Sequence, residues 1–208
     1  SISVEFINEL VDLKTLKDVE FAIIGPEKYI ELGFVDLLES NRIPCLAPRA
    51  ILSRIETSKM YARSVLEKLN IDYLSPYSTS VMSSWVKNYE TDFKNMLRGF
   101  NNSGMKIVLK RNSLCGGKGV MIQDIDFETI DEATEIVKKY DDNYLIEERL
   151  YGEEFSLMTL TDGHNNSINF PPIRDYKRLS NGNTGPNTGG MGCFTDKNNT
   201  LPYLEPED

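Results

Sequence analysis

Two lysines flank a glycine-rich stretch in V-L-K-R-N-S-L-C-G-G-K-G-V, residues 108–120. Lys110 ends an apolar run that predicts a strand, and Lys118 follows Gly116-Gly117 in a predicted loop. One cation held by a sheet and another on a mobile cover would suit a polyphosphate. The segment is not a P-loop, because Lys118 is followed by Gly119 rather than by Ser or Thr. The alternative is a solvated hairpin tip with an ordinary surface lysine.

Four carboxylates lie close together in Y-L-I-E-E-R-L-Y-G-E-E-F, residues 144–155. Glu147 and Glu148 end a predicted strand, and Glu153 and Glu154 follow a glycine turn. Such carboxylates repel one another unless solvent, a cation or a hydrogen-bonding ligand intervenes. A strand end offers backbone groups to an adenine edge, and a carboxylate accepts hydrogen bonds from ribose hydroxyls. The alternative is a solvated acidic edge.

The segment N-T-G-P-N-T-G-G-M-G, residues 183–192, contains four glycines and no charge. Glycine has no Cβ and tolerates positive φ, so a loop of this composition lets backbone N–H groups approach an anionic ligand closely. A D-x-K-R segment, with Asp175, Lys177 and Arg178, precedes it and supplies charge. The alternative is a passive linker or turn, in which Gly, Asn and Thr are common.

The first part of the chain predicts a β-α-β unit that would position such groups. The apolar run Val19–Ile24 ends at Gly25-Pro26, as a buried parallel strand does, and residues 43–46 resemble another short strand. The helix between them is indicated by apolar residues on one face: Ile30, Phe34, Leu37 and Leu38. A second amphipathic helix follows, for which we expect the N-cap at Thr57 or Ser58, Lys59 in the first turn and a left-handed end at Asn70.

Residues 78–146 read as a small α+β subdomain. Aromatic residues repeat at helical spacing between Trp85 and Phe100, a pattern that is far more often core than ligand platform. Residues 106–110 and 119–123 predict a β-hairpin with a glycine-rich tip. A helix near 130–140 and a strand at 143–147 complete the subdomain.

Composition excludes several classes of function. The formal net charge is −9, from 23 Lys plus Arg against 32 Asp plus Glu, which disfavours nonspecific binding to nucleic acid or an anionic membrane. We expect no membrane helix and no targeting segment. The three separated cysteines predict free thiols in a reducing compartment, which we take to be the cytoplasm, and the single His164 reads as a surface residue.

The order of these motifs resembles the ATP-grasp enzymes, and specifically the phosphoribosylamine–glycine ligase family, also called glycinamide ribonucleotide synthetases. The resemblance begins at Ile24-Gly25-Pro26-Glu27, continues through residues 55–59 and runs to the glycine-rich segment. It implies a fold of mixed α/β and α+β class. In this arrangement residues 1–53 end a parallel β-α-β substrate domain, residues 54–208 form the ATP-grasp domain, and residues 78–146 are its mobile lid.

The resemblance also implies a role for each matched position. Residues implied to bind ATP are Lys59, Lys110, Gly116, Gly117, Lys118, Gly119, Glu147, Glu148, Leu150, Glu153 and Glu154. Residues implied to contact glycine or 5-phosphoribosylamine are Gly25, Pro26, Glu27, Pro186, Asn187, Thr188, Gly189, Gly190, Met191 and Gly192. Residues implied to act in catalysis are Asp175, Lys177 and Arg178.

The implied activity is ATP-dependent ligation of glycine to 5-phosphoribosylamine through glycyl phosphate, in de novo purine biosynthesis. ATP and Mg²⁺ are the implied cofactors, with the Mg²⁺ ligands outside this chain. We therefore expect a fragment that lacks both ends, with fusion to or pairing with other purine-pathway domains as an option. Arg111, Asn112-Ser113 and Tyr176 differ from the family pattern. The alternatives are a noncatalytic nucleotide-binding module and a different ATP-grasp carboxylate–amine ligase.

Overall fold

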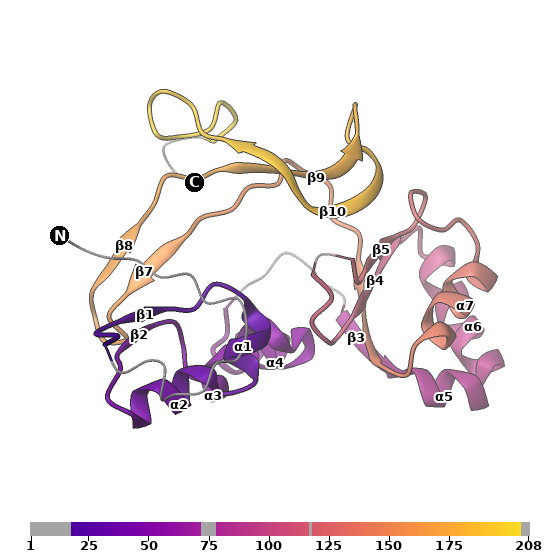
Figure 1. Cartoon of the computed structure of the whole chain (residues 1–208). Helices are drawn as coiled ribbons and strands as arrows, with labels where there is room; N and C mark the ends of the chain where they lie inside the picture. The colour runs from indigo at the N-terminus through magenta and orange to yellow at the C-terminus, as the bar shows by residue number, and fades with distance from the viewer. Residues whose placement is uncertain (1–17, 72–77, 117, 205–208) are drawn as a thin grey trace. The chain divides into compact units, whose positions relative to one another are not determined.

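A computed structural model describes residues 18–71, 78–116 and 118–204 (Figure 1). Residues 1–65 and residues 66–208 form two compact units. Of the predicted site residues, Gly117 lies outside the described residues. Within the described ranges, every helix is too short or too polar to cross a lipid bilayer.

The first unit contains the predicted β-α-β arrangement. Strands β1 (Ala22–Ile23) and β2 (Cys45–Leu46) pair in parallel. Two helices lie between these strands in the chain and two follow them: α1 (Glu27–Glu31), α2 (Phe34–Ser40), α3 (Ala50–Thr57) and α4 (Lys59–Lys68). The β-α-β prediction is therefore confirmed.

The connection between β1 and β2 is two helices, so the prediction of one continuous helix was wrong. Gly33 separates α1 from α2 in a left-handed conformation, with φ of +79°, which glycine adopts without the steric cost of a Cβ. The break changes the helical phase. Val35 and Leu38 are buried, whereas Leu37, predicted to share the apolar face, is 42% exposed.

Helix α4 begins and ends as its sequence predicts. The Ser58 hydroxyl accepts a hydrogen bond from the Tyr61 N–H at 3.2 Å, which satisfies one of the N–H groups that a helix start leaves without a partner. Lys59 is the first helical residue. Asn70, beyond the last turn, has φ of +51°.

The second unit is built on a four-stranded antiparallel sheet with strand order β3-β6-β4-β5. Its strands are β3 (Ser78–Met82), β4 (Ile107–Arg111), β5 (Val120–Ile122) and β6 (Asn143–Glu148). Three helices pack on this sheet: α5 (Ser83–Asn88), α6 (Glu90–Asn102) and α7 (Ile130–Lys139) (Figure 1). The predicted hairpin, helix and strand are thus confirmed.

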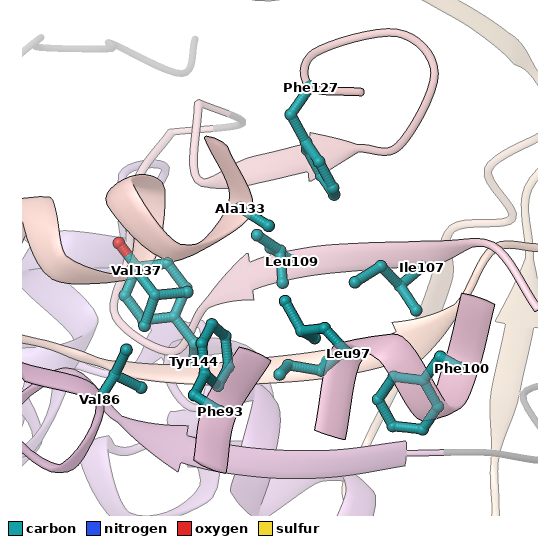
Figure 2. Close-up of a cluster of buried hydrophobic side chains, with 11 residues drawn as sticks. Val86, Phe93, Leu97, Phe100, Ile107, Leu109, Phe127, Ala133, Val137 and Tyr144 are labelled. Atoms are coloured by element: carbon teal, nitrogen blue, oxygen red, sulfur yellow. The ribbon is translucent and has the colours of Figure 1, made fainter. Parts of the chain in front are cut away.

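Helices and sheet meet in a tightly packed core (Figure 2). Phe93 and Leu97 from α6 and Val137 from α7 meet Leu109 of β4 and Tyr144 of β6, and each is at most 1% exposed. Burial raises the pKa of the Tyr144 phenol to about 12, and its hydroxyl donates to the Ile136 carbonyl at 3.0 Å. This core supports the strands from the side opposite to Lys110.

The aromatic stripe belongs to this core, as predicted, but it does not lie on one helix. Phe93 and Phe100 are buried, whereas Tyr89 is 54% exposed. Tyr89 separates α5 from α6 with φ of −126° and ψ of 47°. It stacks on Trp85 with ring centroids 5.9 Å apart.

Two antiparallel hairpins complete the second unit: β7 (Thr159–Thr161) with β8 (Ser167–Asn169), and β9 (Arg174–Ser180) with β10 (Thr184–Phe194). The glycine-rich segment is therefore part of strand β10, and the prediction of a loop was wrong. β9 pairs with Thr184, Asn187 and residues 192–194 of this strand, and two shifts of register separate these pairs.

Candidate functional site

Lys110 is fixed on β4 by an ion pair with Glu147 of β6. Lys110 lies opposite Leu145, so Glu147 is its diagonal neighbour on the same face of the sheet. The Glu147 side chain is 2% exposed and the Lys110 side chain 26% exposed. A buried carboxylate thus holds a partly accessible ammonium in place, on the face opposite the helices. Binding of adenine by Glu147 and of phosphate by Lys110 stays a prediction.

The hairpin loop between β4 and β5 carries the second predicted cation. Gly116 has φ of +54°, a conformation that favours glycine. Gly119 is tightly packed, because a Cβ built there would lie 2.7 Å from Cys115 Sγ. Lys118 lies between them and is exposed, so its ammonium is accessible to an anion.

The segment after β6 is tied back to the sheet by Arg149. Its N–H donates to the Lys106 carbonyl at 2.7 Å, and its guanidinium donates to the Gln123 carbonyl at 2.7 Å. Glu148 is the last residue of β6, and Leu150 is 53% exposed. The predicted adenine-contacting segment therefore starts from a fixed backbone and presents an apolar side chain at the surface.

Strand β9 brings two of the three predicted catalytic residues together. The Lys177 ammonium lies 2.8 Å from Glu154 and 3.8 Å from Asp175. The hydrogen bond that Lys177 donates to the Glu154 carboxylate is the main cause of a raised Lys177 pKa, so this lysine stays charged. Because the Glu154 side chain is 76% exposed, its pair with Lys177 contributes about 1 kcal/mol or less. A ligand anion can therefore replace Glu154 with little loss of stability.

Arg178 lies on the other face of β9, since side chains alternate along a strand. Its guanidinium donates to the Gly185 carbonyl at 2.9 Å and to Asp126 at 3.2 Å. Its side chain is only 9% exposed. Arg178 therefore joins β10 to the turn after β5. On the same strand Arg174 forms an ion pair with Glu153, which like Glu154 is predicted to bind ATP.

Glycines of β10 adopt positive φ, the conformation for which the sequence analysis singled out glycine. Gly185 has φ of +80° and Gly190 φ of +138°. Thr188 donates to the Lys177 carbonyl at 2.9 Å and accepts from the Gly190 N–H at 3.1 Å. Asn187 and Thr188 are half-buried, and the other predicted substrate-contacting residues of this strand are exposed: Pro186, Gly189, Gly190, Met191 and Gly192.

The remaining predicted residues lie in the first unit. Gly25 and Pro26 are exposed after β1, and Glu27 is the first residue of α1. Lys59 is half-buried in the first turn of α4. Their roles with substrate and ATP stay predictions.

Two acidic residues with a structural part in this region were missed by sequence reasoning. Asp126 pairs with Arg178, and Asp142 pairs with Arg111 at 3.2 Å. Each partner is distant in sequence, so no local spacing marks the pair. Within the described ranges, no group of three or more His, Cys, Asp or Glu side chains could hold a metal ion.

Comparison with known structures defines the fold class. The crystal structure of phosphoribosylamine–glycine ligase from Thermotoga maritima aligns with a TM-score of 0.62 and 31% identity, over 86% of this chain and 43% of that chain. D-alanine–D-alanine ligase from Bacillus anthracis aligns with a TM-score of 0.62 over 97% of this chain and 60% of that chain. Its 21% identity shows the fold alone. The chain therefore has an ATP-grasp fold, as predicted.

Sequence comparison then gives the family. Residues 57–207 match the family model described as phosphoribosylglycinamide synthetase, ATP-grasp (A) domain. Phosphoribosylamine–glycine ligase from Methanocella arvoryzae is 37% identical over 92% of this chain and 42% of that protein. The enzyme of the same name from Pyrococcus abyssi is 32% identical over 97% of this chain and 44% of that protein. The chain belongs to the phosphoribosylglycinamide synthetase family, and it spans less than half the length of these relatives.

Proposed function

We propose that the chain forms the nucleotide-binding part of an ADP-forming ligase that joins glycine to 5-phosphoribosylamine in purine biosynthesis, in the cytoplasm. The observation that carries the proposal is the β4–β5 hairpin within the family match. It presents Lys110 from a sheet and Lys118 from a glycine-rich loop. The names of the relatives supply the substrates.

In the proposed reaction, a carboxylate oxygen of glycine attacks the γ-phosphorus of ATP, and the bond to the β-phosphate oxygen breaks to release ADP. The amine of phosphoribosylamine then attacks the carbonyl carbon of glycyl phosphate. An amide forms, inorganic phosphate leaves and the amine loses a proton. The first step brings two anions into contact, so the protein must reduce their repulsion and hold them in line.

The charges of the second unit suit these tasks. Lys110 and Lys118 are proposed to contact the ATP phosphates, and residues 78–146 to close as a lid that keeps water from glycyl phosphate. Lys177, released from the exposed Glu154, is proposed to contact the reacting anions. Arg178 is proposed to hold β10 in place through the Gly185 carbonyl. Mg²⁺ is an expected cofactor, with its ligands expected outside the described groups of side chains.

The test has a binding stage and a catalytic stage. Calorimetric titration with ATP comes first, comparing Lys118→Ala with Lys197→Ala, another exposed lysine of the same unit. Loss of a charge-assisted phosphate contact should weaken ATP binding about tenfold in Lys118→Ala only. Equal affinities for the two variants would contradict the placement of the phosphates.

The catalytic stage measures ADP release with Mg²⁺, glycine and phosphoribosylamine generated in situ. ADP release that requires both substrates supports the proposed ligase. ATP binding without ADP release assigns a noncatalytic nucleotide-binding module instead. Release with another carboxylate and amine, but not with these two, assigns a different ligase.

A further inference from the structure

The loop between β4 and β5, which carries Lys118, is attached at its start to the turn between α7 and β6. Asp142 lies in that turn, directly before Asn143. Its own carbonyl accepts from the Ser83 N–H at the start of α5, at 3.0 Å, and the Asn143 carbonyl accepts from the Asn112 N–H at 2.8 Å. The turn is therefore bonded to a helix on one side and to the first residue of the loop on the other.

The Asp142 carboxylate collects three hydrogen bonds. One oxygen, Oδ2, accepts from Arg111 Nε at 3.2 Å and from the Ser113 hydroxyl at 2.5 Å. The other, Oδ1, accepts from the Asn143 N–H at 2.8 Å. The side chain is 13% exposed, so these bonds are shielded from water and stronger than exposed ones.

The bonds continue from Ser113 into the loop. The Ser113 carbonyl accepts from the Cys115 thiol at 3.2 Å, and the Cys115 carbonyl accepts from the Lys118 N–H at 3.1 Å. Gly119 packs against Cys115 and closes the loop through its carbonyl, which accepts from the Arg111 N–H at 2.8 Å. Arg111 also lies over the Tyr140 ring, 4.1 Å from its centroid. A series of hydrogen bonds thus connects Arg111 and Ser113 to Lys118 and to its neighbour Gly119.

We propose that Asp142 is a positioning residue for this loop, holding Arg111 and Ser113 so that Lys118 is directed at the phosphates of the nucleotide. It acts through these residues and does not touch the ligand. The contact between Lys118 and phosphates rests on the proposed function, whereas the attachment of the loop to Asp142 does not. Without the Asp142 carboxylate, the loop samples more conformations, and ordering it on binding costs affinity.

The first experiment measures amide hydrogen exchange in the unliganded protein. Asp142→Ala should increase exchange at the Lys118 N–H about tenfold or more, because the hydrogen bonds from Arg111 and Ser113 to Asp142 are lost. Asp141→Ala is the matched control, since Asp141 is exposed and adjacent in sequence, and it should leave this exchange unchanged. Equal exchange in the two variants overturns the inference.

Because Asp142→Ala also removes the bond to Asn143, the hydroxyl of Ser113 provides a second test. Ser113→Ala should increase exchange at Lys118, and Ser113→Thr, which keeps a hydroxyl, should restore it. The effects of Ser113→Ala and Asp142→Ala on exchange should be less than additive, since both remove the bond between Ser113 and Asp142. Fully additive effects would contradict the coupling.

The second readout separates positioning from general loss of structure. Asp142→Ala should weaken ATP binding about tenfold and leave adenosine binding unchanged, because adenosine carries no phosphate for the loop to contact. Equal weakening for both ligands overturns the positioning role. If the wild-type chain binds neither ligand, the proposed function fails, and hydrogen exchange still decides whether Asp142 holds the loop.

Discussion

Lys110→Met tests whether the ion pair between Lys110 and Glu147 contributes to stability as a buried pair does. The change removes the ammonium while keeping much of the length of the side chain. The Glu147 carboxylate, 2% exposed, then loses the cation beside it in a region of low dielectric. Breaking a buried pair costs about 3 to 5 kcal/mol. Since the Lys110 side chain is 26% exposed, we take the lower end, about 3 kcal/mol.

For a chain of this size, that loss corresponds to a Tm lower by about 6 to 12 °C. Thermal unfolding followed by circular dichroism measures it. Lys106→Met is the control, because Lys106 also forms an ion pair, with Asp124 at 3.0 Å, but both side chains are more than 40% exposed. That pair contributes about 1 kcal/mol or less.

The double variant Lys110→Met/Glu147→Gln removes both charges and should recover much of the lost stability, since no carboxylate charge stays at position 147 in the interior. The reasoning is refuted if Lys110→Met lowers Tm no more than Lys106→Met does. It is also refuted if the double variant is as unstable as the sum of the two single variants.

Two further predictions concern stability. Hydrogen bonds from Lys94 and Lys138 lower the pKa of Glu90 from 4.5 to about 2. The stabilisation from the charged Glu90 is therefore present above pH 4.5 and is lost as the pH falls toward 2. Urea titrations over this pH range should show a smaller loss in the free energy of unfolding for Glu90→Gln than for wild type. Gly185→Ala should lower the free energy of unfolding by about 1 to 2 kcal/mol, because the φ of +80° at this position disfavours a Cβ. In the same urea assay Gly189→Ala should lower it clearly less, because a Cβ there meets no atom within 4 Å.

Elements governed by near neighbours in sequence were predicted correctly. Helix α4 starts where the Ser58 hydroxyl accepts a hydrogen bond from the N–H three residues later. It ends near Asn70, a residue type that tolerates a left-handed conformation. The β4–β5 hairpin follows from an apolar run, a glycine-rich tip and a second run. In each case the signal and the structure lie within a few residues, so tertiary contacts are not required to recognise them.

Predictions that depend on the phase of a helix or on the pairing of strands over longer stretches were less successful. The glycine-rich segment has the composition of a loop, yet pairing with β9 at Thr184, Asn187 and Gly192 makes it part of a strand. The helix expected before β2 ends at Gly33, whose left-handed conformation changes which residues face the core. Local propensity is a weak guide where pairing with another strand decides the conformation.

The sequence by itself determined the order of the motifs, the identity of the cations and carboxylates, and hence the family. Only the tertiary structure decided which charges meet. Lys110 pairs with Glu147 over 37 residues, Ser113 with Asp142 over 29, and Arg178 with Asp126 over 52. Such partners are determined by strand register and by the packing of the fold around a core. The spacing of residues along the chain does not reveal either of these.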